Sequence, residues 1–134
     1  MKSRGGYLST DPSISKFASW TKLIIYYCDG AMHQGFTIEP IKYKEKELYF
    51  RGSANSRSHF KWLMNTYDFV NAEKVLLTGA SAGGFGAFYW SNHVKSLLKN
   101  PKALYTVPDS AIFMNVTDPL TKTYKTSEEM RVLF

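Results

Sequence analysis

The chain has 134 residues with a formal net charge of +6, and 44% of its residues are hydrophobic and 16% aromatic. This composition supports a packed domain, excludes a largely disordered chain, and contains no run approaching the roughly 18 to 20 apolar residues of a membrane span. The lysines alternate with acidic residues as on a solvated surface, so the charge predicts no nucleic-acid partner, although it is compatible with weak attraction to acidic polysaccharides.

The N-terminal part is polar, lacks the apolar core of a secretory signal peptide, and predicts a surface connection over residues 1–20. Residues 20–27 are β-branched and aromatic, which predicts a largely buried strand ended by turn residues at 28–30. Cys28 is the only cysteine, so neither an internal disulfide nor a cysteine metal site is expected. It is either a small buried residue at the strand end or half of a disulfide whose partner lies outside the chain.

Residues 31–47 predict a loop, and residues 48–50 a short strand. The helix expected next has a capping residue at Ser53, Asn55 or Ser56. Its apolar residues recur at helical spacing: Phe60, Leu63, Met64 and Tyr67.

A strand over residues 74–78, a helix over about 84–98 and a strand over 103–107 complete the predicted elements, before a polar tail from residue 118. The apolar side of this second helix is expected to hold Phe85, Phe88, Tyr89, Val94, Leu97 and Leu98. Alternating strands and helices predict right-handed βαβ units in a parallel sheet, and therefore an α/β fold.

The most informative motif is Gly79-Ala80-Ser81-Ala82-Gly83, between the second predicted strand and its helix. A serine on a tight strand-to-helix turn presents its hydroxyl at the edge of the sheet, as acyl-transfer hydrolases require. Gly79 and Gly83 are expected to meet the steric demands of the turn. Ser81 is therefore the candidate nucleophile, and the N–H of Ala82 at the start of the helix is a candidate oxyanion donor. A structural glycine-rich turn is the alternative.

A serine needs a base, normally a histidine that follows it in this fold class. His93 lies about 18 Å of helix rise beyond Ser81, and His33 and His59 precede the serine, His33 in a loop near the expected rim of the site. No histidine is thus a convincing base. Asp109, after the last predicted strand, is a candidate acid of the triad or a turn residue with local hydrogen bonds.

An α/β-hydrolase sheet usually needs more than about 200 residues, because each parallel strand requires a crossover. We therefore expect an α/β-hydrolase-like parallel sheet with flanking helices that is incomplete in this chain. Residues 1–134 would be the central part of a single domain of this kind.

Four segments together resemble the pectin acetylesterase family, which also contains the animal carboxylesterase Notum. They are residues 27–31 (Tyr-Cys-Asp-Gly-Ala), 49–52 (Tyr-Phe-Arg-Gly), 77–84 around Ser81, and 108–115 after the helix. The resemblance implies a secreted serine carboxylesterase that removes acyl groups, usually acetyl, from oxygen atoms of a polysaccharide. It implies no cofactor and no metal.

By this resemblance Ser81 is the nucleophile, Ala82 an oxyanion donor, and Asp109 a residue at the edge of the site rather than the triad acid. Asp29 and Gly30 are candidate substrate-binding residues that shape the site. The family's second oxyanion segment, catalytic aspartate and catalytic histidine fall outside the matched region, so the chain alone is expected to be nearly inactive. Cys28 is expected to pair with a cysteine upstream of the matched region.

Three alternatives stay open. One is a non-catalytic remnant or carbohydrate-binding pseudoenzyme of the same fold, with aromatic residues that stack on sugars. Another is a Notum-like protein deacylase, and the last is a lipase or peptidase that shares the serine turn. The acyl group, the alcohol and the oligomeric state are not predicted.

Overall fold

The computed structural model describes residues 5–111, 117 and 119–122. Within these residues the chain combines two α-helices with an antiparallel and a parallel strand pair, which is consistent with part of an α/β fold. In chain order the elements are η1 (Gly6–Leu8), β1 (Ile41–Tyr43), β2 (Lys46–Leu48), α1 (Gly52–Thr66), η2 (Phe69–Asn71), β3 (Val75–Ala80), α2 (Ala82–Leu97), η3 (Pro101–Ala103) and β4 (Leu104–Asp109).

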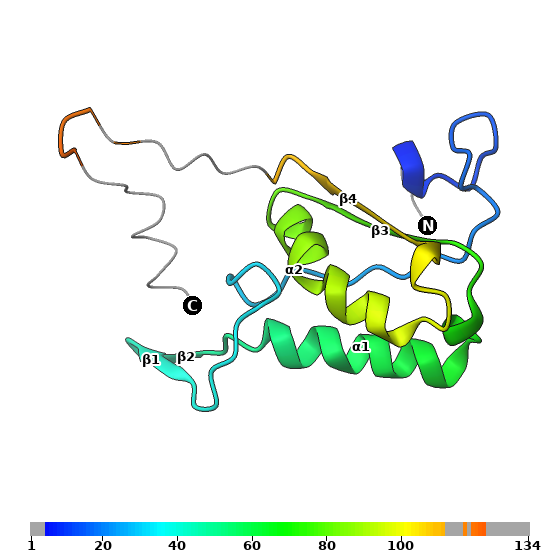
Figure 1. Cartoon of the computed structure of the whole chain (residues 1–134). Coiled ribbons are helices and arrows are strands. Elements are labelled where there is room, and N and C mark those ends of the chain that lie inside the picture. Colours follow the sequence, from blue (N-terminus) through cyan, green and yellow to red (C-terminus); the bar gives the residue numbers. More distant parts are fainter. Residues whose placement is uncertain (1–4, 112–116, 118, 123–134) are drawn as a thin grey trace.

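The centre of the structure is the unit β3–α2–β4, which confirms the predicted parallel pairing (Figure 1). β3 and β4 are in register from Val75 opposite Leu104 to Ala80 opposite Asp109. α2 packs against both strands, and in Figure 1 it lies between this strand pair and α1. The carboxyl ends of both strands therefore meet where α2 begins.

The core forms where the two helices meet, around Phe60 of α1 and Trp90 and Val94 of α2. The Phe60 and Trp90 rings contact edge to face with centroids 5.7 Å apart, a favourable aromatic geometry. The predicted apolar side of α2 is wrong in part, because Phe88 is 69% exposed and Tyr89 51% exposed. With 3.6 residues per turn, positions 87, 90 and 94 share one face, and positions 88 and 89 are rotated away from it.

α1 begins at Gly52 without a capping side chain from its own sequence, which corrects the expected cap at Ser53, Asn55 or Ser56. Ser53 and Ser56 are instead buried on the inner side of the helix. Phe60 is buried as predicted, whereas Tyr67 lies just past the helix and is 48% exposed. The N-terminus of α1 is therefore capped by a residue distant in the sequence, Asp29, whose carboxylate accepts a hydrogen bond from the Gly52 N–H.

Residues 20–27 form no strand in the structure, which corrects the prediction. A strand requires a hydrogen-bonded neighbour, and no backbone hydrogen bond of Thr21 to Ile25 is found among the described residues. Cys28 is exposed rather than buried, with a free thiol. The predicted loop over 31–47 contains the exposed hairpin β1–β2, and the strand expected at 48–50 is wrong in position, because β2 covers Lys46–Leu48 and shares only Leu48 with it.

Candidate functional site around Ser81

Ser81 lies between the last residue of β3 and the first residue of α2, and it is exposed. Its backbone has φ 53° and ψ −119°, a conformation that a non-glycine residue adopts only when its surroundings hold it. Two backbone hydrogen bonds do so. The Ser81 N–H donates to the Asp109 carbonyl oxygen at 2.9 Å, and the Ser81 carbonyl accepts from the Phe85 N–H at 3.1 Å. The strand–turn–helix arrangement predicted from the sequence is therefore present.

The glycines around Ser81 have unequal roles. A Cβ at Gly79 would lie 2.4 Å from the Gly83 carbonyl oxygen, and a Cβ at Gly84 would lie 2.6 Å from the Asp109 carbonyl oxygen. A Cβ at Gly83 would meet nothing within 4 Å. The predicted requirement for glycine is thus confirmed sterically at Gly79 and wrong at Gly83. Gly84, where α2 approaches the end of β4, is the second glycine that the packing requires.

The start of α2 gives the turn a positive electrostatic character. The first N–H groups of a helix have no partner within it and carry the positive end of its dipole. The Ala82 N–H is the first of them, directly after Ser81. A negative charge close to Ser81 is therefore favoured at this end of the helix. The first turn of α2 contains no acidic residue, so no side chain there neutralises the positive end of the helix dipole.

Asp109 is brought next to Ser81 through its backbone and not through its side chain. The carbonyl of Asp109 holds the Ser81 N–H, whereas its exposed carboxylate accepts a hydrogen bond from the Ser110 hydroxyl at 2.9 Å. Ser110 has φ 51°, so the chain turns sharply directly after β4. Asp109 therefore fixes the turn through its backbone, and the described contacts give its carboxylate a hydrogen bond only with Ser110.

The three histidines are engaged elsewhere in the described structure. His93 packs its ring on Phe60 and Trp90, with centroids 5.8 and 5.5 Å away, and burial together with Arg57 lowers its pKa. His59 Nδ1 pairs with the Asn55 carbonyl oxygen at 2.7 Å. No hydrogen bond or ring contact recorded among the described residues joins any histidine to Ser81.

Asp29 occupies the centre of a second cluster, and its side chain is 5% exposed. Oδ1 accepts from the N–H of Ala31 at 3.1 Å and of His33 at 3.4 Å, and Oδ2 accepts from Gly35 at 3.1 Å and Gly52 at 2.8 Å. The carboxylate thus satisfies the loop that follows it and the N-terminus of α1, where a negative charge is favoured. All four partners are backbone groups of the protein, so the carboxylate serves the architecture.

Glycines make this arrangement sterically feasible. A Cβ at Gly52 would lie 1.9 Å from Asp29 Oδ2, and one at Gly35 would lie 2.8 Å from the same oxygen. Gly30 has φ 66°, which favours glycine. The sequence predicts Asp29 as a residue that shapes the site, and its role as the cap of α1 appears only in the fold. The glycines at 35 and 52 were the available signal, but only the fold joins them.

His33 connects the Asp29 cluster to α2. Its carbonyl oxygen accepts a hydrogen bond from Trp90 Nε1 at 3.0 Å, and its ring lies on Tyr27 with centroids 5.1 Å apart. A Cβ at Gly86 would lie 3.0 Å from the His33 ring, so α2 approaches the ring closely at this glycine. Burial lowers the pKa of His33, and the nearby Asp29 charge opposes that shift. His33 is thus a packing residue behind the turn that carries Ser81.

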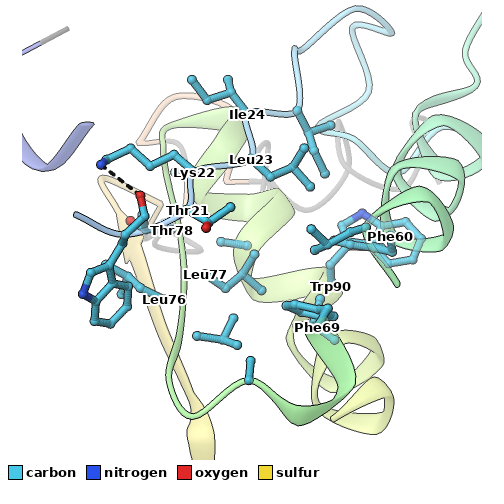
Figure 2. A pocket seen from close by; sticks show the side chains of 18 of the residues that line it. Thr21, Lys22, Leu23, Ile24, Phe60, Phe69, Leu76, Leu77, Thr78 and Trp90 are labelled. Carbon is cyan, nitrogen blue, oxygen red and sulfur yellow. Dashed lines mark hydrogen bonds between the residues drawn. The ribbon is translucent and has the colours of Figure 1, made fainter. Parts of the chain in front are cut away.

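A cavity of about 680 Å³ lies beside β3 and the two helices, and His33 is the one residue of the Asp29 cluster that lines it. Figure 2 shows side chains around it from residues 21–24, from β3 and from both helices; Leu23, Ile24, Leu77, Phe60 and Trp90 are apolar, whereas Thr21, Lys22 and Thr78 are polar. Ser81, Asp29 and Asp109 do not line it.

No group of three or more potential metal ligands occurs among the described residues. Within the same residues, no helix has the length and apolarity needed to span a membrane.

Comparison with known proteins identifies the sequence family. The family model described as Pectinacetylesterase matches residues 2–132. Pectin acetylesterase 5 of Arabidopsis thaliana is 34% identical over 116 residues, which cover 86% of this chain and 27% of the relative. Pectin acetylesterase 4 of the same plant is 32% identical over 116 residues, covering 86% of this chain and 28% of the relative. The chain thus spans little more than a quarter of the length of these relatives. No solved structure gives a significant match.

Proposed function

The chain belongs to the pectinacetylesterase family, and from this membership and the geometry of Ser81 we propose that it carries the nucleophile of a serine carboxylesterase. The substrate we propose is an O-acetylated acidic polysaccharide such as pectin, because the relatives are named pectin acetylesterases. The observation that carries the proposal is the exposed Ser81 at φ 53° directly before the N-terminus of α2.

In the proposed reaction Ser81 Oγ attacks the carbonyl carbon of the acetyl group and transfers its proton to a base. The tetrahedral oxyanion accepts a hydrogen bond from the Ala82 N–H, and its collapse releases the sugar alcohol, which takes up a proton. Water then attacks the acetyl-serine, releases acetate and restores the Ser81 hydroxyl. Since the described histidines have other partners, we infer that the base lies outside the described residues.

Asp109 and Asp29 have supporting roles in this proposal. Asp109 fixes the turn through its carbonyl and lies at the edge of the site, and its carboxylate is free to meet a sugar hydroxyl there in addition to Ser110. Asp29 and Gly30 shape the loop behind the site rather than contact the substrate, because backbone N–H groups enclose the carboxylate. We further propose that the protein acts outside the cell, where such polysaccharides occur.

The test is acetate release from acetylated pectin by the complete reading frame that contains these 134 residues. Ser81→Ala should lower kcat/KM by about 10⁴-fold or more, since loss of a serine nucleophile removes most of the rate. Ser96→Ala is the matched control, because this exposed serine of α2 bonds only to a carbonyl of its own helix. Activity retained in Ser81→Ala would refute the proposal.

Two comparisons sharpen this test. Residues 1–134 alone should release acetate at the background rate, and robust turnover by that segment would contradict the inferred external base. An O-acylated serine peptide offered in place of pectin distinguishes a protein deacylase from the polysaccharide esterase. Faster turnover of the peptide would overturn the proposed substrate while leaving the role of Ser81 intact.

A further inference from the structure

The hairpin β1–β2 is exposed along its whole length. Every residue from 41 to 49 is exposed, and within the described structure the two strands pair only with each other. A two-stranded hairpin is marginally stable by itself, so it needs support at its base. The Thr37 N–H supplies it by donating to the Phe50 carbonyl oxygen at 2.9 Å. The Arg51 guanidinium adds a hydrogen bond to the Ile38 carbonyl oxygen at 2.7 Å.

This hairpin projects from the end of the molecule that carries Ser81. In Figure 1 it lies at the end where β3 finishes and where both α1 and α2 begin. Its base is joined to that end by two hydrogen bonds of Gly35. The Gly35 carbonyl oxygen accepts from the Ser53 N–H at 2.9 Å, and the Gly35 N–H donates to Asp29 Oδ2 at 3.1 Å. A polymeric substrate extends well beyond the one ester that reacts, so this surface is available to it.

Three side chains at the tip of the hairpin form a cationic and aromatic group, the Tyr43 cluster (Tyr43, Lys44 and Lys46). Tyr43 lies opposite Lys46 across the hairpin and is 58% exposed. Lys44 Nζ lies over the Tyr43 ring, 5.4 Å from its centroid. Lys44 has φ 54° in the two-residue turn, where glycine is preferred, so the backbone is strained where this lysine is presented. Neither lysine forms an ion pair among the described residues.

The carboxylates of the hairpin leave these two ammonium groups available. Glu47 lies opposite Lys42, and its Oε2 accepts a hydrogen bond from the Tyr49 hydroxyl at 2.5 Å. Since successive residues of a strand point to opposite faces, Lys42 and Glu47 lie on the other face from Tyr43 and its partner. Glu45, the second residue of the turn, forms no ion pair in the described part of the chain. The face that carries the Tyr43 cluster is therefore open to an anion.

An exposed ring beside two ammonium groups matches the chemistry of an acidic sugar. The C–H face of a pyranose ring packs on an aromatic ring, and a sugar carboxylate pairs with the cations. We propose that the Tyr43 cluster binds carboxylate-bearing sugars of the same polysaccharide whose acetyl group reacts at Ser81. The proposal rests on the proposed function for the identity of the polymer. It adds a selectivity, because a neutral acetylated polysaccharide offers no carboxylate to the two lysines.

Isothermal titration calorimetry with oligogalacturonate as the probe tests this site on the complete reading frame carrying Ser81→Ala. This variant lacks the proposed nucleophile, so the binding result does not depend on esterase activity. Lys44→Ala combined with Lys46→Ala should raise Kd by at least about 5-fold, since two exposed charge pairs are lost. Tyr43→Ala should raise Kd by about 5-fold through loss of the ring contact. All these side chains are exposed, so the melting temperature should stay unchanged.

The matched control removes the same charge elsewhere. Lys61→Ala combined with Lys95→Ala changes two exposed lysines of α1 and α2, and Kd should change by less than about 2-fold. Equal losses in both double variants would assign binding to net charge and overturn the proposal. Equal affinity for a neutral galactan oligomer, or tighter binding of a single-stranded oligonucleotide, would also overturn it.

The two proposals can fail separately. Acetate release that depends on Ser81, together with oligogalacturonate binding that ignores the Tyr43 cluster, would overturn the binding site and leave the proposed esterase intact. Binding that depends on the cluster in a protein without acetate release would refute the esterase and support the binding site.

Discussion

Removal of the Asp29 carboxylate should destabilise the chain more than any other single change at a charged residue described here. Three backbone donors, the N–H groups of Ala31, Gly35 and Gly52, lie within 3.1 Å of its oxygens in a site where Asp29 is 5% exposed. A buried donor without a partner costs about 1 to 3 kcal/mol. Asp29→Ala should therefore lower the free energy of unfolding by about 3 to 5 kcal/mol, similar to breaking a buried charge interaction.

Asp29→Asn separates the charge from the shape of the side chain. The amide keeps one acceptor oxygen but turns an N–H₂ group toward two of the donors, so we expect a loss of about 2 to 3 kcal/mol. Urea unfolding followed by tryptophan fluorescence measures both variants. Asp11→Asn is the control, since the exposed Asp11 carboxylate has hydrogen bonds only with Ser13 among the described residues, and its effect should stay within about 0.5 kcal/mol.

The close contact between Asp29 and Gly52 can be tested by combining substitutions at both residues. Gly52→Ala should be strongly destabilising in the natural sequence, because its methyl group would lie 1.9 Å from Asp29 Oδ2. In the Asp29→Ala background the clash with the carboxylate is removed, but the His33 carbonyl carbon still lies 2.8 Å from the added Cβ, so the same change should cost clearly less than in the natural sequence without becoming neutral. Additive effects of the two substitutions, or a loss below about 1 kcal/mol for Asp29→Ala, would refute the proposed cluster.

The other predictions concern the turn and the buried histidine. Gly79→Ala should prevent the native turn, whereas Gly83→Ala should be neutral or stabilise by up to about 1 kcal/mol, as judged by melting temperature; equal effects would contradict the steric assignment. Ser81→Gly should be about 1 kcal/mol more stable than Ser81→Ala, because glycine relieves the strain at φ 53°; equal urea midpoints would show that the turn is unstrained. His33 has its pKa lowered from 6.5 by burial, so the unfolded chain binds the extra proton first and stability should fall as pH drops below about 6.5. His33→Gln should flatten this slope in urea titrations at several pH values, and an unchanged slope would assign it to other groups.

Local sequence determines the part of the molecule that surrounds Ser81. A short apolar stretch, small residues on both sides of the serine and a helical pattern after it are contiguous, so the strand, turn and helix were all predictable before any contact was known. The parallel pairing of β3 with β4 followed from the same order, since a helix between two strands allows a parallel crossover.

Tertiary structure alone decides the rest. Asp29 and Gly52 are 23 residues apart, and nothing local to either shows that one caps the helix beginning at the other. Residues 20–27 carry the composition of a strand, but a strand exists only when a neighbouring strand supplies backbone hydrogen bonds, and none pairs with Thr21 to Ile25 in the described structure. Composition thus determined what each segment prefers, while long-range partners decided whether the preference is realised.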